Sequence, residues 1–198
     1  MNDYITNEIN YSDQLFDKND KLFKKYLFKS NLYAEYGCGQ STHWVLKNTY
    51  AKILSVDTSL DWVDRIKKLN VYDSNRIKLK HVDLGKVKSW GFPKDYKKRN
   101  YFSEYTNWIW TQTVSPDVIL IDGRFRVCCL FTSLKFAKEG AIILFDDYLN
   151  RPNYHIVENY LSIHEKYGRQ VAFKVPKKKE IDYEMLEKEI INFRHVFD

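Results

Sequence analysis

The chain has 198 residues, 44% of them apolar and 29% charged, a balance that favours one folded domain with a buried core and excludes a disordered chain. The net charge of +6 comes from 32 basic and 26 acidic residues. Because the lysines are scattered, a solvated basic surface is favoured over a nucleic-acid footprint, and no apolar run approaches the roughly 20 residues that span a bilayer.

The three cysteines argue against a disulfide framework. Cys38, Cys128 and Cys129 are odd in number, and the last two are adjacent in a segment predicted to be a buried helix. The first residues lack a basic start followed by an apolar stretch, so no secretory signal is expected. A reducing cytoplasm is the expected setting, with no membrane partner.

The first part of the chain is predicted to begin with a helix, after which strands and helices alternate. Apolar residues near helical spacing over 12–29 indicate an amphipathic helix or helix pair, which gives an N-terminal helical segment within residues 1–30. Ser59 is a plausible N-cap for one of the helices that follow. Strands are predicted at 31–37, 52–57 and 76–83, and helices at 41–48 and 59–69.

Residues 84–115 interrupt this alternation of strands and helices. They carry three of the five tryptophans and Pro93 with no clear period, which predicts a long excursion with one short helix over the site. Its aromatic side chains can stack on a sugar or another planar ring, form a satellite core, or make a subunit contact in a homodimer. The sequence leaves these three alternatives open.

The remaining chain returns to alternation. Strands are predicted at 117–122, 141–147 and 170–175, helices at 125–138, 155–168 (ended by Gly168) and 180–190, and a last strand in INFRHVF at 191–197. Two of these strands are apolar throughout, as in parallel sheets covered on both faces. The sequence therefore predicts a single α/β domain over 1–198, with a doubly wound, mainly parallel sheet and helices on both faces.

Acidic residues mark the ends of the first five strands. In such a sheet, ligands bind beyond the carboxyl ends of the strands, so these positions indicate a site. Each of the five strands ends in an acidic residue or has one just before its glycine turn: Glu35, Asp57, Asp83, Asp122, and the pair Asp146 and Asp147.

The turn EYGCGQST at 35–42 joins the first strand to a helix. Gly37 and Gly39 let a ligand approach the backbone, and the helix start offers free N–H groups. Thr42 stands where a dinucleotide fingerprint has its third glycine. Asp57 follows Glu35 by 22 residues, a spacing that favours hydrogen bonding to a ribose diol over simple capping of the next helix.

The ordered set EYGCGQST, SVDTS, HVD, DVILIDGR and GAIILFDDY resembles the class I S-adenosylmethionine-dependent methyltransferases over residues 31–175. The resemblance implies a Rossmann-like fold and S-adenosylmethionine as cofactor. It implies that Glu35, Gly37 and Gly39 line the methionine part of the cofactor. It further implies that Asp57 binds the ribose hydroxyls, that Asp83 lies near the adenine and that Asp122 adjoins the cofactor, while Trp62 either packs near the cofactor or belongs to the core.

A closer likeness is to the metal-dependent O-methyltransferases of the catechol type. It implies that Asp122, Asp146 and Asp147 hold Mg²⁺, although the last position is usually asparagine in that family, and GRFR at 123–126 lacks the lysine that acts there as base. Three converging carboxylates repel unless they are neutralised. A cation can do this, or Arg124 and Arg126 can, and these arginines can instead hold an anionic substrate group.

The candidate catalytic residues are Asp122, Arg124, Asp146 and His155. His155 is either a general base, since its ordinary pKa lies near neutrality, or the start of a helix bonded to a nearby carboxylate. The candidate substrate-binding residues are Arg124, Arg126, Asp147 and Arg151.

The expected function is a transferase that methylates a small molecule or glycan precursor on oxygen. The alternative is a methyltransferase-fold domain without methyl transfer, which binds a nucleotide-like or anionic ligand. Nucleic acid is disfavoured as substrate, because the sequence has neither the motif of base-amino methyltransferases nor a concentrated basic stripe.

Overall fold

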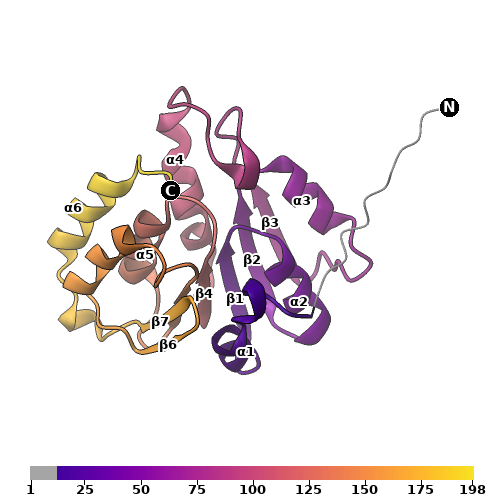
Figure 1. Ribbon diagram of the computed structural model, residues 1–198, viewed down its shortest axis with the longest axis horizontal. Coiled ribbons are helices and arrows are strands. Elements are labelled where there is room, and N and C mark those ends of the chain that lie inside the picture. Colours follow the sequence, from indigo (N-terminus) through magenta and orange to yellow (C-terminus); the bar gives the residue numbers. More distant parts are fainter. Residues whose placement is uncertain (1–12) are drawn as a thin grey trace.

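The computed structural model describes residues 13–198, and Figure 1 shows them as a twisted sheet with helices on both sides. The part of the expected N-terminal helical segment that falls in residues 1–12 lies outside this range. The strands follow the order β3-β2-β1-β4-β5-β7-β6, parallel from β3 to β5 and antiparallel for β7 and β6. Their bounds are β1 (Leu32–Tyr36), β2 (Lys52–Asp57), β3 (Ile77–His81), β4 (Val118–Ile121), β5 (Ile142–Phe145), β6 (Glu165–Tyr167) and β7 (Gln170–Lys174). This architecture confirms the predicted α/β fold.

Helices cover both faces of the sheet. In Figure 1, α1, α2 and α3 lie on one side of the sheet, and α4, α5 and α6 lie on the other. Ser59 caps α3 as predicted, since its side chain accepts a hydrogen bond from the Trp62 N–H. Within residues 13–198, none of the helices has the length and apolar character that a membrane crossing requires. The bounds are α1 (Lys21–Leu27), α2 (Gln40–Asn48), α3 (Leu60–Lys67), α4 (Phe102–Asn107), α5 (Arg126–Phe136) and α6 (Tyr183–Phe193).

The central strands are apolar on both faces because each face packs against helices. Along β4, Ile119 and Ile121 enter the core under α5, while Val118 and Leu120 enter the core under α1 and α2. This alternation follows from the two-residue period of a strand. Each fully buried side chain of this kind contributes about 1.5–3 kcal/mol relative to an exposed one.

The excursion at 84–115 is partly core and partly surface. It contains one α-helix, α4, as predicted, together with three 3₁₀ turns. Phe102, Tyr105 and Ile109 are fully buried under the sheet, so this part belongs to the core. Trp90 is instead 74% exposed.

Two predicted elements near the C-terminus are wrong. Residues 155–168 do not form a helix: a 3₁₀ segment covers Pro152–Asn159, and β6 then pairs with β7. Gly168, at φ +56°, lies in the turn between these two strands rather than ending a helix. The expected last strand at 191–197 is also wrong, because α6 continues to Phe193. Strand pairing and helix packing, which are tertiary effects, override the local pattern here.

The order in which strands join the sheet reverses between β1 and β4, which are parallel neighbours. Beyond their ends, Gly37 and Gly123 are in close contact: a Cβ on Gly37 would lie 2.9 Å from the Gly123 Cα. A Cβ on Gly123 would lie 2.1 Å from the Tyr105 hydroxyl. Gly37 also has φ +95°, which favours glycine. These two strand ends approach each other because neither residue has a side chain.

Replacing Gly123 with alanine should therefore destabilise the protein. The new Cβ would meet backbone as well as Tyr105, so we expect a loss of about 1–3 kcal/mol in the free energy of unfolding, as for other overpacked sites. Gly39→Ala is the matched control, since a Cβ there meets nothing within 4 Å. Urea denaturation of the two variants measures the difference, and equal losses would contradict the close contact.

Candidate active site

A cavity of about 760 Å³ opens at the carboxyl ends of β1, β2, β4 and β5. Its walls come from the glycine turn after β1, from Asp57 at the end of β2, and from the turns that follow β4 and β5. Such a position at the switch point of a doubly wound sheet is where these folds bind ligands. Of the predicted site residues, the cavity brings together Gly37, Gly39, Asp57, Asp122, Arg124, Arg126, Asp147 and Arg151.

Glu35 lies beneath the glycine turn and does not line the cavity. It is fully buried, and its carboxylate accepts hydrogen bonds from the hydroxyls of Tyr33 (2.8 Å), Ser41 (2.8 Å), Ser55 (2.8 Å) and Thr42. Burial raises the pKa of Glu35, while the hydrogen bonds oppose that rise. The residue therefore holds the start of α2 against β1 and β2, and it shapes the turn rather than touching a ligand.

Asp57 fixes the same turn from the other side and remains available to a ligand. Its carboxylate accepts the backbone N–H groups of Cys38 (2.8 Å) and Ser59 (2.6 Å). Burial raises the pKa of Asp57, and these hydrogen bonds lower it. Because each carboxylate oxygen has two lone pairs, both oxygens can accept a further hydrogen bond from the cavity.

Asp83 and His155 lie outside the residues that line the cavity. Asp83 follows the edge strand β3, is exposed, and pairs with Lys98. His155 lies with its Nε2 3.2 Å from the Tyr148 carbonyl oxygen, and its ring stacks on Tyr148 with 5.0 Å between centroids. The structure thus does not bring Asp83 or His155 to the cavity, and His155 packs against Tyr148 instead.

Asp146 is also removed from the cavity, because an arginine and a glutamine enclose it. Its side chain is 0% exposed. Arg169 binds it through two nitrogens, Nε at 3.1 Å and Nη2 at 2.7 Å, and the Gln170 amide donates a third hydrogen bond at 2.8 Å. Asp146 is therefore a buried, fully engaged ion-pair partner.

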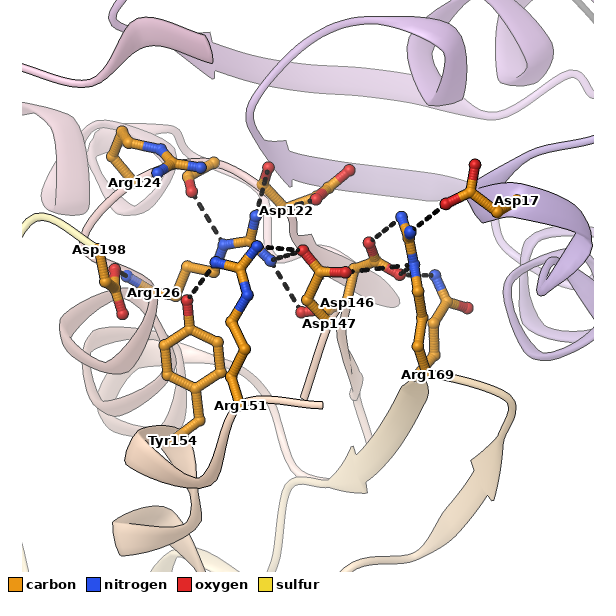
Figure 2. A network of polar contacts seen from close by, with 12 residues as sticks. Asp17, Asp122, Arg124, Arg126, Asp146, Asp147, Arg151, Tyr154, Arg169 and Asp198 are labelled. Carbon is orange, nitrogen blue, oxygen red and sulfur yellow. Dashed lines mark hydrogen bonds and ion pairs between the residues drawn. The ribbon is translucent and has the colours of Figure 1, made fainter. Parts of the chain in front are cut away.

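Asp122 and Asp147 share a cluster of arginines, and Figure 2 shows Arg126, Arg151 and Arg169 pointing toward their carboxylates. Arg126 lies 3.2 Å from Asp122 and 3.6 Å from Asp147. Asp147 also pairs with Arg151 at 2.7 Å and with Arg169 at 3.3 Å. Each carboxylate of the expected metal triad thus has a guanidinium partner.

The charge of Asp122 remains costly despite this pairing. Burial is the largest effect and the Asp146 carboxylate the next, and together they raise the pKa of Asp122 from 3.8 to about 7. Arg126 opposes the rise. The Asp122 side chain is 30% exposed, so it stays accessible from the cavity.

The expected metal triad has no counterpart in the geometry. Within residues 13–198, no three His, Cys, Asp or Glu side chains are placed to hold a metal ion together. Asp122, Asp146 and Asp147 each face arginine instead. Since a guanidinium supplies the positive charge that the carboxylates need, their repulsion is offset without a cation.

Sequence reasoning missed Arg169 and the segment 14–18. Arg169 lies in the turn between β6 and β7, and the wrong helix predicted at 155–168 hid this hairpin. Residues 14–18 line the cavity, and Phe16, Asp17 and Lys18 all have positive φ, at 51°, 52° and 71°. Asp17 pairs with Arg169 at 2.5 Å, so the segment is tied to the arginine cluster. No signal in the sequence predicts this long-range pair.

The cysteines agree with the expected absence of a disulfide framework. All three are buried and unpaired. Cys38 lines the cavity, but burial and then Asp57 raise the pKa of its thiol well above the ordinary value. A thiol held protonated in this way is a packing residue rather than a nucleophile.

Comparisons with known proteins identify the fold. No family model and no curated protein matches the sequence. Among solved structures, a methyltransferase-like protein from Silicibacter pomeroyi is similar over 88% of this chain and 92% of its own, with 26% identity and a TM-score of 0.78. An O-methyltransferase from Bacillus cereus in complex with S-adenosylhomocysteine is similar over 77% of each chain, with 14% identity and a TM-score of 0.51.

These structures share the wound sheet that carries the cavity described above. The chain therefore has the fold of the class I S-adenosylmethionine-dependent methyltransferases, a fold that an O-methyltransferase shares.

Proposed function

We propose that the protein transfers a methyl group from S-adenosylmethionine to an oxygen atom of a small molecule or glycan precursor. One observation carries this proposal: the cavity lies at the switch point between β1 and β4, where Gly37, Asp57 and Asp122 meet. A methyltransferase-fold domain that binds a nucleotide-like ligand without methyl transfer remains the alternative outcome of the tests below.

The residues around the cavity fit the proposed cofactor. The volume of about 760 Å³ lies within the range of small-molecule sites. Gly39 leaves backbone open to close approach, since a Cβ there would meet nothing within 4 Å, and Asp57 has acceptor capacity for a ribose diol. Trp62 and Trp90 line the same cavity with ring centroids 6.2 Å apart and planes within 16°, so they offer a flat surface for adenine or for an acceptor ring.

Asp122 is the proposed general base. When bound, S-adenosylmethionine supplies an electrophilic methyl group on a positively charged sulfur. Asp122 would accept the proton of the acceptor hydroxyl as the oxygen bonds to the methyl carbon and the carbon–sulfur bond breaks. A carboxylate with a pKa of about 7 suits this task, since a base works best with a pKa near the working pH. The protein otherwise contributes by holding the two reactants in line.

Arg126, Arg151 and Arg169 take the place of the cation in this proposal. Their guanidinium groups neutralise the three carboxylates that a catechol-type enzyme would use for Mg²⁺. We therefore propose a reaction that proceeds without a divalent metal.

Calorimetric titration with S-adenosylhomocysteine tests the cofactor assignment. We expect the wild-type protein to bind it and Asp57→Asn to bind it about ten- to a hundredfold more weakly, because charge-assisted hydrogen bonds to the ribose are lost. Asp83→Asn is the matched control, since Asp83 follows the neighbouring strand outside the cavity. Absence of binding to the wild type would overturn the proposed function, and equal weakening in both variants would overturn the role of Asp57.

Titration with Mg²⁺ tests the proposed role of the arginines. We expect neither measurable Mg²⁺ binding to the protein saturated with S-adenosylhomocysteine nor a change in cofactor affinity when EDTA is added, because the carboxylates are already paired. Binding of Mg²⁺ that is lost in Asp147→Asn would contradict this expectation.

The raised pKa of Asp122 predicts a pH-dependent stability. Between the ordinary pKa of 3.8 and about 7, the folded protein keeps a proton that the unfolded chain has released. Stability should therefore fall with rising pH in this window, and it should fall less in Asp122→Asn, which has no such proton. Urea denaturation at pH 5, 6, 7 and 8 measures both curves, and parallel curves would show that the pKa of Asp122 is not raised.

A further inference from the structure

Arg124 differs from the other arginines around the cavity because it has no anionic partner. It is only 9% exposed, and its Nε is buried without a hydrogen-bond acceptor. Within residues 13–198 it forms no ion pair, whereas Arg126, Arg151 and Arg169 each pair with at least one aspartate. Arg124 is therefore a largely buried cation in the cavity wall that has no ion-pair partner of its own.

An unpaired buried guanidinium is costly. Arginine stays protonated in proteins, so it cannot escape the cost of burial by losing its charge. Burial lowers the pKa of Arg124, and the nearby charge of Arg126 lowers it further. Buried charges are ordinarily paired, and an exception next to a cavity indicates a site that a ligand completes.

The surroundings of Arg124 compensate its charge only in part. Its guanidinium carbon lies 5.8 Å from the centre of the Phe92 ring, a cation–π contact, and Phe92 packs edge-on against Phe197. The carboxylate of Asp198 attracts Arg124 electrostatically but forms no ion pair with it. Asp198 accepts a hydrogen bond from the backbone N–H of Arg126 at 3.0 Å. The environment is thus aromatic with one carboxylate close by, and the guanidinium fork stays available.

We propose that Arg124 binds an oxyanion of the methyl acceptor, a carboxylate or a phosphate, at the edge of the cavity. The inference rests on the proposed function and adds to it the chemical class of the substrate. A guanidinium matches both groups, because it presents parallel N–H donors to two oxygens.

The position of Arg124 in the chain relates this anion to the reacting oxygen. Arg124 follows Asp122 by two residues, so their Cα atoms are at most about 7 Å apart. An acceptor held by its anionic group at Arg124 could therefore present a hydroxyl to Asp122 within one small molecule. Anion binding would then fix the orientation of the acceptor as well as its affinity.

Anion titrations of the protein saturated with S-adenosylhomocysteine test the proposal. The probes are inorganic phosphate and benzoate, each titrated calorimetrically at constant ionic strength. We expect the wild type to bind at least one of them and Arg124→Met to lose at least tenfold in affinity for it. Arg99→Met is the matched control, because Arg99 is an exposed arginine outside the cavity lining, and its affinities should equal those of the wild type.

The choice of probe identifies the oxyanion. Binding of phosphate alone indicates a phosphorylated acceptor, and binding of benzoate alone indicates an aromatic carboxylate. If neither anion binds the wild type, or if Arg124→Met binds as tightly as the wild type, the proposal is overturned. Failure of S-adenosylhomocysteine to bind would instead overturn the proposed function. The anion titrations are therefore repeated without S-adenosylhomocysteine, so that anion binding is measured independently of cofactor binding.

Thermal melting separates ligand binding from a structural role. Since Arg124 forms no ion pair and its Nε has no acceptor, Arg124→Met should melt no lower than the wild type. A large drop in Tm would indicate a structural arginine and contradict the proposal. Arg124→Lys keeps the charge without the fork, so it should fold and bind the anion with intermediate affinity.

Discussion

The pairing of carboxylates with guanidinium groups at the ends of β4 and β5 is the interaction on which the site depends. Asp122, Asp146 and Asp147 lie close together because parallel strands end at the same edge of the sheet. Such a group of like charges would force the strand ends apart or take up protons. Arg126 and Arg169 prevent this, and the remaining cost appears as the raised pKa of Asp122.

Much of the fold could be predicted because local and tertiary preferences agree in the parallel part of the sheet. Strands such as 117–122 are apolar throughout, and only a strand buried on both faces suits that pattern. The antiparallel edge could not be predicted in the same way. Residues 155–168 contain apolar side chains at spacings that suit a helix, and the pairing of β6 with β7 that decides the outcome is a contact between separate segments.

The sequence could predict that site residues lie at the carboxyl ends of strands. It could not predict which of these strand ends line the cavity. Asp57 and Asp122 end the central strands and line it, whereas Asp83 ends the edge strand and lies outside. The role of Glu35 was not predictable, because an acidic residue before a glycine turn can face either a ligand or buried hydroxyl groups. Here it faces the hydroxyls of Ser41 and Ser55. The role of Arg169 could be recognised only from the β6–β7 hairpin that carries it.

Arg169 joins a buried carboxylate to an exposed one. The same guanidinium contacts Asp146, which is 0% exposed, and Asp17, which is 86% exposed. An ion pair to so exposed a carboxylate contributes only about 0–1 kcal/mol. Loss of the contact with Asp17 would thus cost little, while the buried side chains of Leu15 and Phe16 hold the segment 14–18 in place and Arg169 stays paired with Asp146. The electrostatic field around Asp122 therefore depends on the buried pair of Arg169 and Asp146 far more than on the exposed carboxylate of Asp17.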